Sequence, residues 1–225
     1  MASKSGRQEK TERVSSKKRK AGAAARPSPR DRKRAQIIAA ARETFFAQGY
    51  AGASMDQIAV RSGVSKATVY AHFRSKDELL LAVAEEVLQA VRSAMTELPR
   101  ADELRKGLGQ LGRRASRQLT SPPAIALQRL AITEARRFPE IARALHDTGA
   151  GAALAAVVKP TFEATLADIL RTDDPQVALT HFYEMCFGKM LRDVLMGLSP
   201  APSARQIENN VRLAVDAFLE GYAAR

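Results

Sequence analysis

The chain has 225 residues, of which 45% are hydrophobic, and its formal net charge is +12. This length and composition allow a substantial buried core without covalent staples. The single cysteine, Cys186, excludes an internal disulfide framework. No apolar run approaches the roughly 18 residues of a membrane span, and the first residues lack the apolar segment of a signal peptide. We therefore expect a soluble protein of a reducing compartment, the cytoplasm, with no membrane partner.

The positive charge is concentrated at the N-terminus. Residues 1–34 hold 13 Lys and Arg against 3 Asp and Glu, a net of +10, whereas residues 35–225 hold 23 against 21, a net of +2. With almost no large apolar residue, residues 1–34 cannot form a core, which predicts a disordered basic arm. Such an arm could follow DNA phosphates through counterion release, or it could be a solvated tail.

The remainder of the chain has the pattern of successive helices. Alanine-rich sequence after Pro29 places Ile37, Ile38, Ala41 and Phe45 at helical spacing, and Gly49 is positioned to end that helix. Further helices are expected near residues 101–119, 124–137, 139–147, 150–171 (kinked at Pro160), 175–197 and 203–223. No segment combines β-branched alternation with hairpin turns. The sequence therefore predicts an all-α fold.

Two short helices and the start of a third lie between residues 54 and 80. Ser54 begins the sequence SMDQ, a capping-box pattern with Gln57, and Ser75 begins a second one, SKDE. Between them, Gly63 supplies a turn and Ser65 starts a helix that ends by about residue 73. Two short helices joined by a tight glycine turn have the layout of a helix-turn-helix.

The second helix of such a motif enters the major groove of DNA with its N-terminal residues at base edges. Its outward residues are expected to be Lys66, Ala67, Thr68, Tyr70, Ala71 and His72. Lys66 and Thr68 are then the natural base readers, although Lys66 could also be simply solvated. Tyr70 and His72 can donate to phosphates, and so can Lys76 and Ser54 at helix N-termini.

The run from Ala40 through TFFAQGYAGASMDQIAVRSGVSKATVYAHFRSKDELL resembles the tetracycline-repressor (TetR) family of bacterial regulators. By that resemblance, Thr68, Tyr70, His72 and Lys76 match positions that commonly touch DNA. Met55 and Ala71 depart from the residue types frequent in the family. The resemblance implies three parts: the basic arm, a helix-turn-helix DNA-binding domain over residues 35–82, and a larger helical domain over residues 83–225 that binds an effector and forms a homodimer.

The last two predicted helices carry broad apolar stripes that could form the dimer interface as a four-helix bundle. One stripe consists of Ile207, Val211, Ala214, Val215, Phe218, Leu219 and Tyr222, and the other of Val177, Phe182, Met185, Gly188 and Leu195. The alternative is that these stripes pack inside one subunit. A dimer would place two reading helices about 34–36 Å apart, which predicts a near-palindromic operator.

The resemblance also implies an effector pocket. Its candidate wall residues are Phe138, Phe162, His181, Phe182, Met185 and Phe187, each of which could instead belong to ordinary core. Few charged residues accompany them, apart from Arg129, Glu134, Arg136 and Arg137. This pattern favours a largely apolar small-molecule effector.

Two other function classes fit the sequence less well. An enzyme is disfavoured because only three histidines are present and no nucleophile motif or phosphate loop is found. His181 and Cys186 are too far apart around a helix to chelate zinc, so no metal or cofactor is expected. The second alternative is a general binder of nucleic acids or anionic surfaces acting through residues 1–34. We predict a homodimeric transcriptional regulator, most simply a repressor of double-stranded DNA operators.

Overall fold

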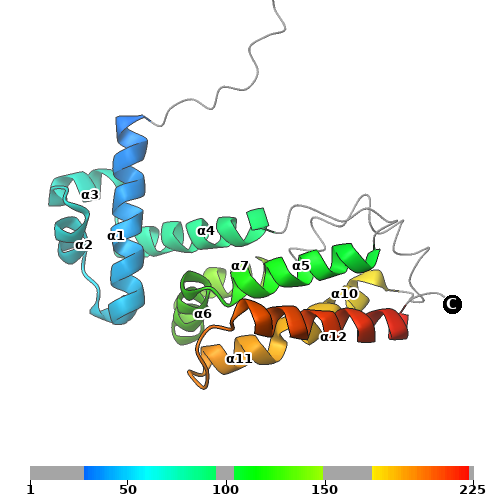
Figure 1. Ribbon diagram of the computed structural model, residues 1–225. Helices are drawn as coiled ribbons and strands as arrows, with labels where there is room; N and C mark the ends of the chain where they lie inside the picture. The colour runs from blue at the N-terminus through cyan, green and yellow to red at the C-terminus, as the bar shows by residue number, and fades with distance from the viewer. Residues whose placement is uncertain (1–27, 95–103, 149–173, 223–225) are drawn as a thin grey trace, which may run out of the picture. The chain divides into compact units, whose positions relative to one another are not determined.

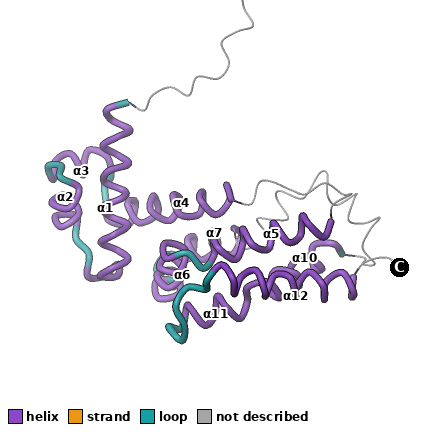
Figure 2. Tube along the Cα trace, viewed as in Figure 1, coloured by secondary structure: helices purple, strands orange, loops and turns teal. Residues whose placement is uncertain are grey.

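The computed structural model describes residues 28–94, 104–148 and 174–222, and every regular element within them is helical (Figures 1 and 2). The helices are α1 (Pro29–Gly52), α2 (Met55–Ser62), α3 (Lys66–His72), α4 (Lys76–Ala94), α5 (Leu104–Leu119), α6 (Pro122–Glu134), α7 (Pro139–Thr148), α10 (Pro175–Tyr183), the π-helix η3 (Glu184–Gly188), α11 (Lys189–Leu195) and α12 (Ala204–Tyr222). The all-α prediction is confirmed. The predicted helix over 150–171, with Pro160 and Phe162, lies outside the described residues, and no described helix is long and apolar enough to cross a bilayer.

The first helix begins earlier than the sequence pattern indicated. α1 starts at Pro29, so residues 29–34 are helical and are not part of an irregular arm. Ser28 Oγ accepts from the Asp31 amide at 3.1 Å, and Asp31 Oδ2 accepts from the Ser28 amide at 3.1 Å. The Ser28 hydroxyl, which donates to Asp31 Oδ2 at 2.7 Å, and the Ser28 amide together lower the pKa of Asp31. A reciprocal cap with proline at the first helical position starts the helix despite the local density of positive charge.

The helix boundaries around the two short helices agree with the predicted caps. Ser54 Oγ accepts from the Gln57 amide and the Gln57 side chain accepts from the Ser54 amide, completing the capping box. Gly63 has a φ of 66°, and Gly49 interrupts α1 with a φ of 72°. Both glycines therefore take the left-handed conformation that side-chain-bearing residues avoid. Ser65 caps α3 through the Thr68 amide.

One hydrophobic cluster joins the helix-turn-helix to α4, α6 and α7. Its members from α1–α3 include Ile37, Phe45, Ile58 and Val69, with Phe73 just beyond α3. The remaining buried members come from the following helices: Leu79, Leu80, Val83, Ala84, Val87, Leu88, Leu127, Leu130, Ala131, Phe138 and Ile141. The short helices, which would be unstable alone, are therefore held by side chains contributed from α4.

The second cluster packs α5 against α10, η3 and α12, which lie side by side in Figure 1. Gly112 on α5 makes this approach possible: a Cβ built there would lie 2.9 Å from Cys186 Sγ and 2.9 Å from a Val211 methyl carbon. Five residues in the middle of the predicted 175–197 helix form η3, a feature that hydrophobic spacing did not indicate. A π-turn rotates the faces of the helix before and after it relative to each other.

The predicted interface stripe on α12 is mostly internal. Ile207, Val211, Ala214, Val215 and Phe218 are all buried in the second cluster, against α5 and η3 of the same chain. The interface interpretation of these five residues is therefore wrong, because they form the core that holds α12 in place. Phe182 of the second stripe is fully buried as well. Other side chains of these helices remain exposed: Val177, Met185 and Leu213.

Candidate nucleic-acid interface and an apolar cavity

The outer surface of α3 presents the residues expected to face DNA. Lys66, Ala67, Tyr70 and Ala71 are exposed, with 45% of Tyr70 accessible, whereas Val69 is completely buried. Thr68 and His72 are half-buried, and Ser54 at the start of α2 is exposed. This division follows from the helical period, since only one side of a two-turn helix can anchor it.

Lys66 is engaged by a residue of the preceding helix. Its Nζ lies 2.7 Å from Asp56 Oδ1 and 3.0 Å from Oδ2, and both side chains are largely exposed. The carboxylate raises the pKa of Lys66 through this hydrogen bond and its charge. Sequence reasoning identified Lys66 but missed Asp56, although Asp56 lies in the first turn of α2, facing the start of α3. Lys66 must leave this partner, or share it, to reach a base.

Lys76 is occupied inside the domain. Its ammonium donates to the carbonyl oxygens of Tyr50 at 2.8 Å and Ala53 at 2.9 Å, and lies 4.3 Å from the centre of the Tyr50 ring. The carbonyls at the end of α1 therefore fix the first turn of α4. The sequence assigned Lys76 a phosphate contact only, and it contained no sign of this internal role.

Tyr50, near the end of α1, also links the helix-turn-helix domain to the turn between α6 and α7. Its hydroxyl donates to Asp77, its ring meets Phe138 edge-on at 4.9 Å, and the Arg137 guanidinium lies over it at 4.7 Å. Arg137 and Asp77 also form an ion pair at 3.6 Å. Phe138, predicted as a pocket wall, instead packs in this cluster, because Tyr50 and the α7 start enclose it.

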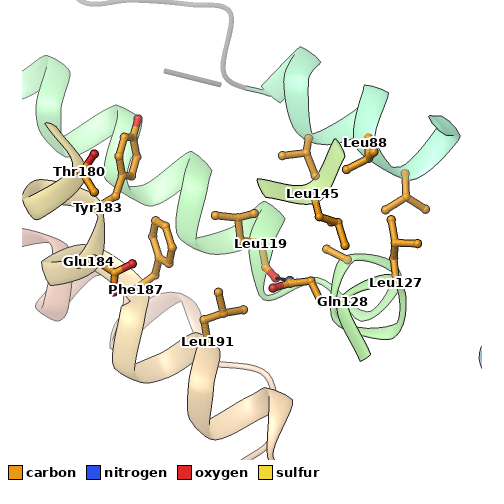
Figure 3. A pocket seen from close by; sticks show the side chains of 13 residues that line it. Leu88, Leu119, Leu127, Gln128, Leu145, Thr180, Tyr183, Glu184, Phe187 and Leu191 are labelled. Atoms are coloured by element: carbon orange, nitrogen blue, oxygen red, sulfur yellow. Dashed lines mark hydrogen bonds between the residues drawn. The ribbon is translucent and has the colours of Figure 1, made fainter. Parts of the chain in front are cut away.

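An apolar cavity of about 210 Å³ lies between α4, the α5–α6 corner, α7 and the α10–α11 segment (Figure 3). Its lining residues are Val87, Leu88, Val91, Leu119, Ala124, Leu127, Gln128, Leu145, Thr180, Tyr183, Glu184, Phe187 and Leu191. An apolar cavity of about 150 Å³ suffices to bind benzene, so this one has room for a somewhat larger molecule.

The predicted pocket residues largely lie elsewhere. Phe187 lines the cavity, whereas Phe182 is buried in the second cluster and Met185 is exposed. His181 is exposed and its Nδ1 is hydrogen-bonded to the Tyr222 hydroxyl, outside the cavity. The cavity side of this segment follows the ordinary helical spacing of Thr180, Tyr183, Glu184 and Phe187, and the predicted residues fall outside that face except for Phe187. Phe162 lies outside the described residues.

Two polar features mark the cavity and its surroundings. The Tyr183 hydroxyl is buried without a hydrogen-bond partner among the described residues, and burial raises its pKa well above the usual value. The Gln128 amide donates to the Leu119 carbonyl oxygen at 3.3 Å. Arg129, noted as a nearby charge, instead donates to the carbonyl oxygens of Val194 and Leu195 and so caps α11.

Residues 28–94, 104–148 and 174–222 contain no cluster of three His, Cys, Asp or Glu that could hold a metal ion. Cys186 is buried against Gly112, and burial raises its pKa to about 12. Its thiol is therefore a packing group in this structure and is poorly suited to act as a nucleophile.

An exposed reading helix held between capped helices, followed by a helical domain with an apolar cavity, defines a helix-turn-helix DNA-binding regulator. Residues 37–83 match the family model of bacterial regulatory proteins of the tetR family, and residues 106–224 match the C-terminal domain of AefR-like transcriptional repressors. The chain belongs to the TetR family of transcriptional regulators, which agrees with the prediction that it is not an enzyme.

Similar proteins include the transcriptional repressor Rv3405c of Mycobacterium tuberculosis, 34% identical over 137 residues, which is 57% of this chain and 69% of that protein. The transcriptional activator FasR of Mycolicibacterium smegmatis is 48% identical over 71 residues, 30% of this chain, and the match spans only 32% of FasR. A TetR-family regulator from Mesorhizobium loti has 30% identity and a TM-score of 0.72, covering 88% of this chain and all of that one. The flavonoid-responsive regulator FrrA has 29% identity and a TM-score of 0.69, covering 86% and 98%.

Proposed function

We propose that the chain is a repressor that binds a near-palindromic operator as a homodimer and releases it when a small molecule occupies the cavity. The exposed polar surface of α3 carries this proposal, because it is presented to solvent between two capped helices. Residues 35–82 form the DNA-binding domain and residues 83–225 the effector and dimerisation domain. The two matching family models, over 37–83 and 106–224, support that division.

In this proposal Lys66 and Thr68 read bases from the start of α3, while Tyr70, His72 and Ser54 contact phosphates, with Ala67 allowing close approach to the groove. Tyr70→Ala should weaken binding to operator and random DNA alike by about tenfold, since a phosphate contact carries no sequence information. Tyr70→Phe should lose as much if the hydroxyl makes the contact. Unchanged affinity for Tyr70→Ala in a fluorescence anisotropy titration would reject the role.

The basic arm adds phosphate contacts. Deleting residues 1–27 leaves the Ser28–Asp31 cap of α1 intact. The deletion should reduce the slope of log affinity against log salt while preserving a preference of about 10³ or more for the operator. A general binder acting through the arm would show no such preference in the full chain and would lose binding on deletion.

The homodimer uses the outer side of α10, η3 and α12. Val177, Met185 and Leu213 are exposed there, with accessible fractions of 47%, 37% and 57%. Asn210 on α12 donates to the Met185 carbonyl oxygen. The exposed side chains of α10 and η3 and that of Leu213 on α12 therefore lie on either side of the contact between these helices. A second copy can cover this apolar face by two-fold symmetry, as closed dimers commonly do.

Leu213→Glu tests the dimer. The substitution should give a folded monomer by light scattering, with a loss of operator affinity because one reading head cannot span both half-sites. Leu198→Glu is the matched control, because Leu198 is 72% exposed in the turn between α11 and α12 and should tolerate the charge. A dimer that survives Leu213→Glu would exclude this face.

α4 connects the cavity to the helix-turn-helix domain that carries the proposed DNA-reading helix α3. Val87, Leu88 and Val91 of α4 line the cavity, and the first turn of the same helix is fixed to Tyr50 through Lys76 and Asp77. A molecule in the cavity that favours a different position of α4 would shift the separation of two reading heads in a dimer. The response of FrrA to flavonoids supports an aromatic effector for this chain.

Repression is favoured over activation because Rv3405c, a repressor, matches over 57% of this chain, whereas the match to the activator FasR covers 30%. Selecting bound fragments from the source genome, with and without candidate effectors, tests the whole proposal. Ala124→Phe should fill the cavity and abolish release by the effector so identified. Release unchanged in a folded Ala124→Phe protein would place the effector elsewhere.

A further inference from the structure

The rim of the cavity carries a negative charge. Glu184, on η3, lines the cavity and is exposed to solvent. No ion pair or hydrogen bond joins its side chain to any residue in the described part of the chain. In Figure 3 its carboxylate lies beside the Phe187 ring, below Tyr183. A carboxylate with no partner among the described residues, exposed beside the cavity, sets the sign of the charge that a bound molecule meets there.

The other described lining residues carry no group that would compensate an anion. The lining residues among the described parts of the chain include no lysine, arginine or histidine. An anionic group would lose hydration on entry and face the Glu184 carboxylate, both of which oppose binding. A cation at the rim would instead be attracted by Glu184 and by the aromatic faces of Tyr183 and Phe187.

Tyr183 contributes its ring to the wall, but its hydroxyl is fully buried and points away from the other labelled lining side chains in Figure 3. Among the described lining residues, Glu184 is therefore the group that can distinguish bound molecules by their charge.

We infer that the cavity takes apolar organic amines, with the apolar body among the leucines and the ammonium group at Glu184, in preference to alcohols and carboxylates of the same shape. The inference names the ligand class of the site and rests on the proposed function only where release of the operator is concerned. Amines, alcohols and carboxylates of the same shape fill the same apolar volume, so a difference in their affinity for the cavity reports their different charge.

Phenylbutylamine, phenylbutanol and phenylbutyric acid test the charge preference by isothermal titration calorimetry at neutral pH. The amine should bind about fivefold more tightly than the alcohol and at least about tenfold more tightly than the acid, as expected for a rim ion pair. Glu184→Gln should bring the amine to within about twofold of the alcohol. Glu220→Gln, at an exposed position on α12 outside the cavity, should leave the order unchanged.

The outcomes distinguish the charge preference of the cavity from the role of its ligand in releasing the operator. If the acid binds as tightly as the amine, if Glu184→Gln preserves the ranking, or if none of the three compounds binds, the charge inference is overturned. If the compounds bind in the expected order but neither they nor any effector from the genomic selection releases the operator, the effector role fails and the charge preference stands.

Discussion

The head around α2 and α3 and the body around α5, η3 and α12 are specified in different ways. In the head, contacts between near neighbours set the boundaries: Ser54 with Gln57, and Ser65 with Thr68. In the body, residues far apart in sequence decide the packing, as when Gly112 admits Cys186. Local contacts fix where a helix begins, whereas distant contacts fix which of its faces is buried. The two regions should therefore respond differently to the same kinds of perturbation.

The largest expected effect concerns the thiol of Cys186, deep in the body. Its pKa of about 12 leaves it on the order of a thousandfold less ionised near pH 8 than an ordinary thiol. Burial slows the reaction further. Iodoacetamide should therefore alkylate the native protein at least about a thousandfold more slowly than the urea-unfolded chain, and the native rate should still be rising past about pH 10, where an ordinary thiol is almost fully ionised. Native labelling within about tenfold of the unfolded rate would mean that the body opens readily.

The second prediction concerns the core of α12. Phe218 is fully buried, with its ring 5.2 Å from Phe182 and 5.0 Å from Tyr222. Phe218→Ala should reduce the free energy of unfolding by about 3–5 kcal/mol, through lost burial and the cavity left behind. Urea unfolding followed by circular dichroism measures this loss. Leu198→Ala, in the turn before α12, is the control, and as a 72% exposed residue outside the proposed dimer face it should cost far less. Similar losses for the two would contradict the packing of α12.

The sequence alone predicted the helix boundaries in the head, because the caps and turns that set these boundaries involve residues close together in the chain. The capping box at Ser54 and the turn at Gly63 were both predicted, and both occur. The second predicted box is only half formed: Ser75 accepts from the Glu78 amide, but the Glu78 carboxylate accepts from the Arg74 amide. What the sequence could not show was which side-chain charges pair across helices, such as Asp56 with Lys66.

The body was predicted less completely because its faces depend on partners distant in sequence. An apolar stripe indicates that a helix face is buried, but it does not identify the element that covers this face. The stripe on α12 was therefore interpreted as an interface, although α5 of the same chain covers it. The cavity wall was missed for a related reason. Thr180, Tyr183, Glu184 and Phe187 share one helical face at i, i+3, i+4 and i+7, but spacing within one helix could not show that Leu88 and Leu145 would complete a cavity from other helices.

A third prediction tests the local character of the head. Ser54→Ala removes the acceptor of the Gln57 amide and should destabilise the protein by about 1 kcal/mol, as typical for an N-cap. Ser199→Ala is the control, because Ser199 is exposed in the turn between α11 and α12 and caps no helix. Its substitution should cost less than about half as much. Equal losses in urea unfolding would show that the capping bond is not what distinguishes the head.

The smallest expected effect concerns the ion pair at the reading surface. Asp56→Asn should leave α2 intact while releasing Lys66 and removing a negative charge that faces the approaching phosphates. We expect binding to random DNA to tighten by roughly two- to fivefold at low salt, with less gain for the operator, so the preference for the operator falls. Asp56→Asn combined with Lys66→Ala should lose this gain, because the freed lysine makes the added contact. If the double variant keeps the gain, the carboxylate acts by repelling DNA directly and not by holding Lys66.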